Sequence, residues 1–251
     1  MSDRSQPIRL VPLTGLPEIE PGADLAALIR SAAADAGVEL DGRIVVLCQK
    51  IVSKAEGRLV DLADVTPSAE AVEIGTEHER DPRQVEVVLR ESKRIVRRGY
   101  GVLITETHHG FVCANAGVDL SNSPGAEIAV LLPLDPNASA RRLHEALSTG
   151  GQHTPVVITD TFGRPWREGL VDVALGSAGL APIRDDRGSL DRSGRELIVT
   201  RPAVADQLAA AAGLLMLKSA GVPVVVVEGF PYEGDGDVRE LLRDPATDLF
   251  K

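Results

Sequence analysis

The chain has 251 residues, enough for one large domain or two modest ones. Hydrophobic residues make up 43% of the sequence and charged residues 25%, which excludes a disordered or collagen-like chain. The net charge of −10 argues against nucleic-acid binding, because an acidic surface repels a phosphate backbone. No apolar run approaches the ~18 residues of a membrane-spanning helix, and the N-terminus lacks an apolar signal core. We therefore expect a cytoplasmic protein with neither nucleic acid nor membrane as a partner.

Cysteine and aromatic residues are scarce. Cys48 and Cys113 lie at the end of or inside apolar runs, which favours two buried thiols in a reducing compartment over a disulfide. Aromatic residues make up only 3% of the chain, so the core must consist of Val, Leu, Ile and Ala. This composition also argues against base-stacking platforms.

The first part of the chain predicts two short strands and three helices. The strand that ends at Cys48 shows no polar alternation, so it should be buried on both faces. Two of the predicted helices follow an aspartate that can cap them, Asp24 and Asp81. In chain order the elements are a strand over Ile8 to Leu13, a helix over Leu25 to Ala36, a strand over Arg43 to Cys48, and helices over Ser68 to His78 and Pro82 to Arg90.

The remaining chain predicts a hairpin, further strands and helices, and one exposed region rich in charge and glycine, Ile183 to Leu197. Strands and helices alternate irregularly, so we expect an α+β fold with mixed sheets and not a doubly wound parallel sheet. The predicted strands cover Val102 to Thr105, Phe111 to Ala114, Glu127 to Leu132, Thr154 to Thr159 and Pro223 to Glu228, and the predicted helices cover Ala138 to Ser148, Val204 to Lys218 and Val238 to Leu242.

Three polar segments follow predicted strands, where a rigid strand end can hold exposed functional groups. The first, Gln49 to Arg58, carries Lys50, Lys54 and Arg58 at a spacing of four residues. If this segment is helical, the three cations share one side and suit phosphate or carboxylate charge. A solvated basic face explains the same spacing equally well.

The second segment, Asn115 to Asn122, surrounds Asp119 with small polar residues. Gly117 and Ser121 would let a ligand approach the backbone, and the oxygens of the segment suit a hard cation. Taken alone, the segment favours an Asx-turn, in which Asp and Asn bond only to nearby backbone.

The third segment begins with Asp160 and Thr161 at the end of a predicted strand. A carboxylate and a hydroxyl there suit Mg²⁺ or Mn²⁺, and Arg164 and Arg167 beside them suit phosphate. The alternative is an aspartate that only caps a turn or helix. The pair gains interest from Asp119, which offers a second carboxylate of the same kind.

Several common catalytic motifs are missing from the sequence. The absence of Gly-x-x-x-x-Gly-Lys-Ser/Thr, and of Gly-x-Gly-x-x-Gly after a strand, argues against a standard P-loop or Rossmann cofactor site. No nucleophile elbow supports Ser-His-Asp catalysis. His108 and His109 are adjacent on a predicted hairpin, where neighbouring side chains point to opposite faces, so a shared metal ion is not favoured.

Four ordered segments form a recognisable set. They are Thr14-Gly15-Leu16-Pro17, Val52-Ser53-Lys54-Ala55-Glu56-Gly57-Arg58, Ala114-Asn115-Ala116-Gly117-Val118-Asp119 with Ser121-Asn122, and Ile158-Thr159-Asp160-Thr161-Phe162-Gly163-Arg164. Together they resemble the signature segments of the coenzyme F420-0:γ-glutamyl ligase family. The similarity runs from about Ile8 to Gly229, which is nearly the whole chain.

The resemblance implies a GTP-dependent amide ligase that adds L-glutamate to the terminal carboxylate of a deazaflavin precursor, coenzyme F420-0, through an acyl phosphate. It implies an α+β fold of two interlocked subdomains, a homodimer, and Mn²⁺ or Mg²⁺, with K⁺ as an optional further cation. GTP, L-glutamate and F420-0 are the expected small-molecule partners. We expect one ligase domain over residues 1–251, without the flavin reductase domain that some bacterial relatives carry.

The family pattern also implies roles for individual residues. Lys54 and Arg164 are the expected catalytic cations, which would take up negative charge during phosphoryl transfer. The expected nucleotide contacts are Leu16, Pro17, Glu18, Ile19, Gln49, Lys54 and Asn122. The expected metal ligands are Asp119, Asp160 and Thr161.

Two places depart from the family pattern. Gln49 stands where the family often has a small hydroxyl residue. Leu217 and Lys218 stand where many members have Gly and then an acidic or amide residue, so Lys218 is expected either to replace one metal site or to face water at a helix end. Two further functions stay open: an acyl-phosphate amide ligase with another acceptor, and a nucleotide-binding homologue without ligase activity.

Overall fold

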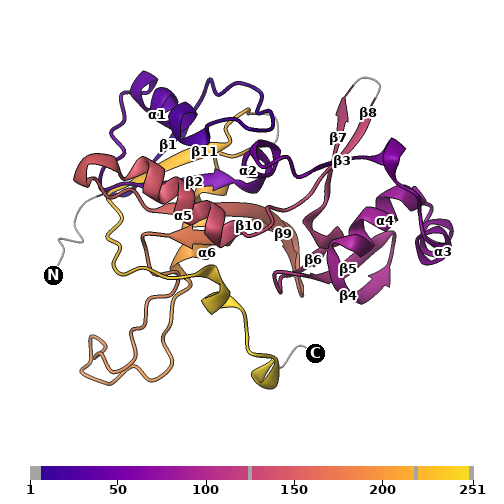
Figure 1. Ribbon diagram of the computed structural model, residues 1–251. Helices are drawn as coiled ribbons and strands as arrows, with labels where there is room; N and C mark the ends of the chain where they lie inside the picture. The colour runs from indigo at the N-terminus through magenta and orange to yellow at the C-terminus, as the bar shows by residue number, and fades with distance from the viewer. Residues whose placement is uncertain (1–6, 124–125, 218–219, 249–251) are drawn as a thin grey trace.

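The computed structural model describes residues 7–123, 126–217 and 220–248 (Figure 1). Its helices and mixed sheets confirm the expected α+β class. The largest sheet has five strands, of which β2 and β9 are the one parallel pair. In spatial order the strands are β1 (Arg9–Leu13), β11 (Val224–Glu228), β2 (Ile44–Cys48), β9 (Val156–Arg164) and β10 (Arg167–Ala178).

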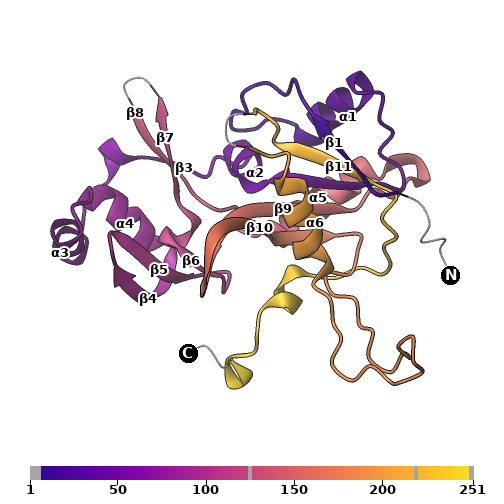
Figure 2. The same cartoon turned by 180° about the vertical axis from the view of Figure 1, so that it is seen from behind.

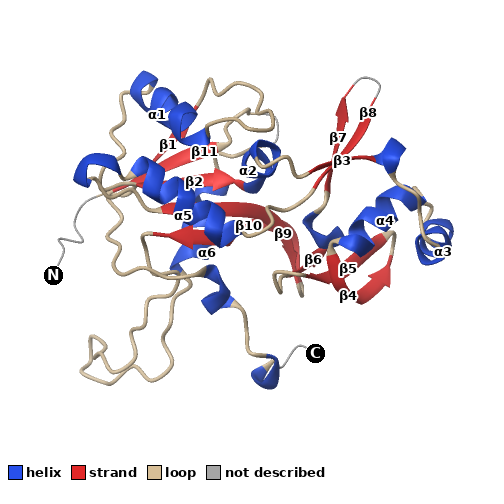
Figure 3. Ribbon diagram, in the orientation of Figure 1, coloured by secondary structure: helices blue, strands red, loops and turns tan. Residues whose placement is uncertain are grey.

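Both faces of β2, in the middle of this sheet, are buried, as its unbroken apolar run predicts. Val45 packs into the apolar cluster on one face, and its neighbour Val46 packs into the cluster on the other face. Within the described residues, no helix is long and apolar enough to cross a lipid bilayer. Helices α1 (Leu25–Asp35), α2 (Gln49–Ala55) and α5 (Pro136–Leu147) contribute to the first cluster, and α6 (Val204–Gly213) contributes to the second (Figure 3).

The remaining elements form a second lobe beside the large sheet (Figures 1 and 2). Two small apolar clusters, one around Ile74 and one around Leu62, fill this lobe. The expectation of one interlocked ligase domain over residues 1–251 stays a prediction. The elements of the lobe are sheets β3 (Leu59–Asp61), β8 (Ala126–Val130), β7 (Asp119–Ser123) and β4 (Ser92–Gly99), β5 (Val102–Thr107), β6 (Val112–Ala114), with helices α3 (Ala69–Glu77) and α4 (Pro82–Arg90).

The caps at Asp24 and Asp81 are confirmed, since each carboxylate accepts a backbone N–H of the following turn. Strands β4 and β10 are not predicted by the apolar pattern, because charged residues occupy their exposed parts. The predicted helix over Val204 to Lys218 is too long, since α6 ends at Gly213 and Lys218 lies outside the described residues. Short 3-10 turns cover Leu62–Asp64, Asn115–Gly117, Thr149–Gly151, Val238–Leu241 and Pro245–Thr247.

Residues 183–203 form an arm that extends away from the large sheet (Figure 1). A bridge between Ile183 and Ala203 closes its base. The expected exposure of this charged and glycine-rich region is confirmed, and apolar side chains such as Leu190 and Ile198 are exposed there as well. The arm therefore contributes little to the core of the sheet.

Candidate functional site

The carboxyl end of β2 and the middle of β9, where the parallel pairing of the two strands ends, open onto a cleft of about 590 Å³. Ligands commonly bind at the carboxyl ends of parallel strands, because the chain leaves the sheet there and exposes polar groups. The central cleft, as we call it, is lined by residues 16–19, 48–51, 54, 119–120, 159–161, 172, 216–217 and 221–223. Its walls therefore come from both lobes, since residues 119–120 belong to β7 and the others to the large-sheet lobe.

Most of the predicted site residues meet in this cleft although they lie far apart in the sequence. The loop after β1, helix α2, the start of β7 and the middle of β9 each contribute. The predicted site residues that line the cleft are Leu16, Pro17, Glu18, Ile19, Gln49, Lys54, Asp119, Asp160 and Thr161.

Two predicted site residues are not placed there. Arg164 is exposed at the end of β9, where its guanidinium donates to the carbonyl oxygen of Glu168 at 3.1 Å, and it is not among the residues that line the cleft. The backbone of Asn122 pairs with Glu127 in the β7–β8 ladder, while the side chain of Asn122 lies outside the described structure. The catalytic role of Arg164 and the nucleotide contact of Asn122 stay predictions.

Helix α2 carries both lysines of the cleft. The ammonium group of Lys50 forms an ion pair with Asp119, and that of Lys54 forms one with Glu18. Asp119 is therefore engaged across the two lobes, and its interpretation as a mere Asx-turn residue is wrong. The Lys54 side chain is only 18% exposed, against 79% for Glu18, so the solvated-face alternative does not fit Lys54.

Arg58 does not share the side of the helix that carries Lys50 and Lys54. Gly57, with a positive φ of 68°, follows the end of α2 and turns the chain away. The Arg58 guanidinium donates to Glu91 at 2.7 Å and to the carbonyl oxygen of Leu132 at 3.0 Å. The expected row of three cations is therefore wrong at its last member.

Gln49 begins helix α2 and is almost completely buried, with 2% of its surface exposed. The Ser53 hydroxyl, one helical turn further on, donates to Gln49 Oε1 at 2.8 Å. This hydrogen bond fixes the orientation of the amide at the wall of the cleft. The Gln49 side chain therefore presents a polar group in a fixed orientation, although it is larger than the small hydroxyl residue that the family often has at this position.

The carboxylates of the cleft are unusual in their protonation. The pKa of Asp160 is raised to about 7, mainly by burial and in part by the negative charges of Asp119 and Asp172. A hydrogen bond from the backbone N–H of Thr161 and the charge of Lys50 offset part of this rise. Burial also raises the pKa of Asp172. The apolar pattern misses Asp172 because it lies on the unpredicted strand β10; only recognition of a β9–β10 hairpin would have placed it opposite Thr161.

The donor set of the cleft suits a divalent cation that also contacts phosphate. No group of three His, Cys, Asp or Glu side chains in the described ranges is gathered closely enough to hold a metal ion alone. Mg²⁺ is usually bound by one or two carboxylates together with substrate phosphates, and not by a complete protein cage. Asp119, Asp160 and the Thr161 hydroxyl match that pattern, and the raised pKa of Asp160 is expected of a carboxylate that lacks its cation.

Comparison with known proteins shows which family has this arrangement. The model of the F420-0:gamma-glutamyl ligase family matches residues 15–229, which include all of the four segments noted in the sequence except Thr14. The chain belongs to this family. The matched range spans both lobes and every residue that lines the central cleft.

Curated members of the family align with almost the entire chain. A protein of Methanothermobacter thermautotrophicus named coenzyme F420:L-glutamate ligase is 46% identical over 250 residues, which are 97% of this chain and 99% of the relative. The protein of the same name from Methanopyrus kandleri is 42% identical, with 97% and 98% covered. That from Natronomonas pharaonis is 45% identical, with 91% and 88% covered. The chain is thus similar to these three relatives over both of its lobes.

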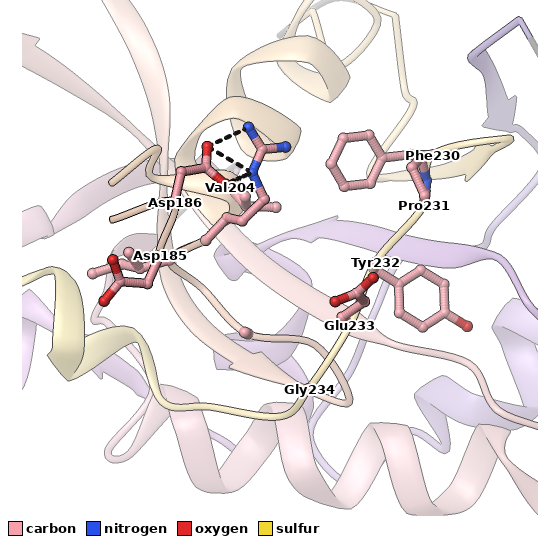
Figure 4. Close-up of a pocket in the computed structure, with 11 residues that line it drawn as sticks. Asp185, Asp186, Val204, Phe230, Pro231, Tyr232, Glu233 and Gly234 are labelled. Carbon is pink, nitrogen blue, oxygen red and sulfur yellow. Dashed lines mark hydrogen bonds and ion pairs between the residues drawn. The ribbon is translucent and has the colours of Figure 1, made fainter. Parts of the chain in front are cut away.

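A second hollow, of about 460 Å³, lies at the base of the arm (Figure 4). This arm-base hollow is lined by residues 181, 183–186, 204 and 230–234. The guanidinium of Arg184 donates to the carboxylate of Asp186 at 2.9 Å. Figure 4 shows the side chains of Asp186 and Phe230 among those that surround the hollow. Asp185 is bonded to Arg187 and lies 3.9 Å from Arg201. Both aspartates of this hollow are therefore paired with arginines of the chain.

The two adjacent histidines serve the hairpin turn. His108 Nε2 lies 3.0 Å from the carbonyl oxygen of Arg90, and His109 Nε2 lies 2.9 Å from that of Pro133. Both contacts tie the turn to neighbouring backbone, as expected for hairpin histidines. The two cysteines are free thiols, Cys113 buried and Cys48 half-buried, and burial raises the pKa of Cys113 to about 12.

Proposed function

We propose that this chain is a GTP-dependent ligase that joins a carboxylate of coenzyme F420-0 to the amino group of L-glutamate. The observation that carries the proposal is that the residues which the family pattern assigns to GTP and to metal ions, except Asn122, converge on one cleft. The names of the relatives that align with almost the entire chain support the choice of the two substrates. The homodimer and a K⁺ ion belong to the same proposal on the ground of family membership alone.

The reaction has two steps with an acyl phosphate between them. A carboxylate is a poor electrophile at neutral pH, so its oxygen first attacks the γ-phosphorus of GTP, and the bond from that phosphorus to the bridging oxygen breaks to release GDP. The amino nitrogen of L-glutamate then attacks the acyl carbon. Phosphate leaves with the electron pair of the C–O bond, and the nitrogen gives up a proton to form the amide.

The chain supplies cations and donors for the triphosphate. Lys54 is held in the cleft by Glu18 and balances negative charge that moves toward the leaving GDP. Gln49 presents an amide that Ser53 keeps in place. The loop over residues 16–19 adds the apolar side chains of Leu16, Pro17 and Ile19 as a surface for the nucleotide.

The acidic side of the cleft would hold the divalent cation. Asp119, Asp160 and Thr161 would bind Mn²⁺ or Mg²⁺, which supplies neutralisation of the charge that otherwise keeps phosphate and acceptor carboxylate apart. Lys50 interacts with both aspartates, because it forms an ion pair with Asp119 and its positive charge lowers the pKa of Asp160. Lys50 thus limits the net negative charge that the cleft carries before any ligand binds.

The proposal is tested by incubating the chain with GTP, Mn²⁺, L-glutamate and F420-0 and following the deazaflavin by mass spectrometry. We expect the precursor to gain the mass of glutamate minus water, with one GDP released for each amide formed. Omission of GTP, or its replacement by ATP, is the matched control for the nucleotide. The Asp160→Asn variant is the control for the site.

The same assay separates the two alternatives. Release of GDP with another carboxylate, and none with F420-0, would assign the chain to a related amide ligase with a different acceptor. Binding of GTP without GDP release under every condition would assign it to nucleotide binding without ligation. Either outcome rejects the proposed reaction and leaves membership of the family intact.

A further inference from the structure

Thr161 and Asp172 form a pair across the β9–β10 hairpin. They are opposite each other in the strand register, and the Thr161 hydroxyl donates to Asp172 Oδ1 at 3.0 Å. A threonine hydroxyl has one proton and two acceptor lone pairs. Because Asp172 accepts the proton, the lone pairs are what Thr161 can offer to a ligand in the cleft. This is the orientation in which a hydroxyl oxygen can coordinate a cation.

Helix α6 leaves space for the other oxygen of the same carboxylate. A Cβ atom at Gly213 would lie 2.0 Å from Asp172 Oδ2 and 2.7 Å from its Cγ. No side chain is therefore compatible with the observed position of Asp172. The helix is also fixed on β10, since the backbone N–H of Ala174 donates to Asp206 Oδ1 at 2.9 Å.

These contacts fix the place of the Asp172 carboxylate between Thr161 and helix α6. Oδ1 accepts from Thr161, and Oδ2 lies against the backbone of α6 at Gly213. Asp119, Asp160 and Asp172 do not form a three-carboxylate metal group within the described residues. The contacts of Asp172 thus point to a role that is exercised through Thr161.

We propose that Asp172 is a positioning residue that holds the Thr161 hydroxyl with its lone pairs turned toward the divalent cation, without touching the ion itself. The inference rests on the proposed function, which assigns Thr161 to that cation. A hydrogen-bond partner of a metal ligand fixes its orientation, and loss of such a partner typically weakens metal binding about 10- to 100-fold. Gly213 contributes to this arrangement, because the absence of a side chain there leaves room for the Asp172 carboxylate.

The test measures Mn²⁺ binding by the electron paramagnetic resonance signal of free Mn²⁺ at saturating GDP, which requires no turnover. We expect Asp172→Ala and Thr161→Val each to raise the dissociation constant about 10- to 100-fold. The double variant should bind Mn²⁺ no more weakly than either single variant, because each substitution alone already abolishes the same interaction, that of the oriented Thr161 hydroxyl with the ion. Asp172→Asn should recover most of the affinity, since its amide oxygen still accepts the Thr161 proton.

A second test changes the position of the Asp172 carboxylate by a substitution in helix α6. Gly213→Ala should displace the Asp172 side chain and weaken Mn²⁺ binding as Asp172→Ala does, yet have no further effect when Asp172 is already Ala. Gly99→Ala is the matched control, because a Cβ there meets nothing within 4 Å. Melting temperatures of all variants check that they are folded.

Three results would overturn the inference. One is an Asp172→Ala dissociation constant within twofold of the native value while Asp160→Asn abolishes binding. The second is multiplication of the single losses in the Thr161→Val, Asp172→Ala double variant, which would make Asp172 a separate ligand. The third is an Asp172→Asn variant as weak as Asp172→Ala. If Asp160→Asn also leaves Mn²⁺ binding unchanged, the metal assignment of the proposed function fails instead.

Discussion

The central cleft and the arm-base hollow lie at opposite ends of the same strand. Residues 221–223, just before β11, line the cleft, and residues 230–234, just after it, line the hollow. Their volumes are similar, about 590 and 460 Å³, and both contain aspartates. Size and composition therefore do not distinguish them, but the state of their charges does.

In the hollow both aspartates, Asp185 and Asp186, are paired with arginines of the chain. Hydrogen bonds from Arg187 lower the pKa of Asp185 to about 2, whereas burial raises that of Asp160 in the cleft to about 7. Among the described residues, no Lys or Arg forms an ion pair with Asp160 or Asp172. A buried carboxylate without a cationic partner in the chain is costly, so it marks the place where a cation from outside belongs. By this criterion the cleft is the site and the hollow is not.

The largest expected contrast is in catalysis. Asp160→Asn keeps the size of the side chain but removes a charge that would bind the metal, so we expect glutamate ligation at saturating Mn²⁺ to fall about 100-fold or more. Asp185→Asn, the matched change in the hollow, should leave the rate within about twofold. The measurement is the steady-state rate of F420-0 glutamylation. Equal rates for the two variants would remove the cleft from the catalytic site.

Nucleotide binding gives the next effect in size. Lys54→Ala should weaken GTP binding by about 1.5 to 3 kcal/mol, which is typical of a hydrogen bond to a charged group. The control is Lys93→Ala, because Lys93 also pairs with a glutamate, Glu106 at 2.8 Å, but is exposed on β4 and does not line the cleft. Isothermal titration with GTP compares them. A negligible loss of GTP affinity in Lys54→Ala would mean that Lys54 is an ordinary surface cation and not a phosphate contact.

A smaller effect is expected in the pH dependence of stability without metal. The folded chain keeps the Asp160 proton up to about pH 7, while the unfolded chain releases it near the ordinary value of 3.8. Between these pH values the folded state binds more protons, so the stabilising contribution is complete below about pH 4 and disappears as pH rises to about 7. The native chain should therefore lose about 1 kcal/mol of its free energy of unfolding over this pH range, after allowance for solvent screening. The Asp160→Asn variant should not show this loss.

The measurement is the free energy of unfolding in urea at several pH values, with EDTA present. Addition of Mn²⁺ at pH 8 should stabilise the native chain and leave Asp160→Asn unchanged. A native curve that runs parallel to that of Asp160→Asn between pH 4 and 7 would contradict the raised pKa. Asp185→Asn provides the comparison from the hollow.

The sequence predicts elements with strong local signals and misses those that depend on distant partners. Pro82–Arg90 is predicted with its exact bounds because Asp81 caps it and Pro82 fits its first turn. β10 is missed because its outer half has charge and glycine and is ordered only by pairing with β9. Asp119 and Asp160 could be paired in one cleft only through the family resemblance, since no periodicity connects β7 with β9.

The smallest expected effect is in the arm-base hollow itself. Arg184 donates to both oxygens of Asp186, yet its side chain is 47% exposed. Exposed ion pairs contribute about 0 to 1 kcal/mol, because water screens the charges and the side chains lose conformational freedom. Arg184→Ala should therefore lower the free energy of unfolding by less than about 1 kcal/mol and leave ligation unchanged. Arg195→Ala, which removes a pair with Asp191 on an 81% exposed side chain, is the matched control and should cost less still. A loss above about 2 kcal/mol for Arg184→Ala, or a fall in ligation, would mean that the balanced charges of the hollow support the cleft across β11, and the two regions would then have to be treated as one.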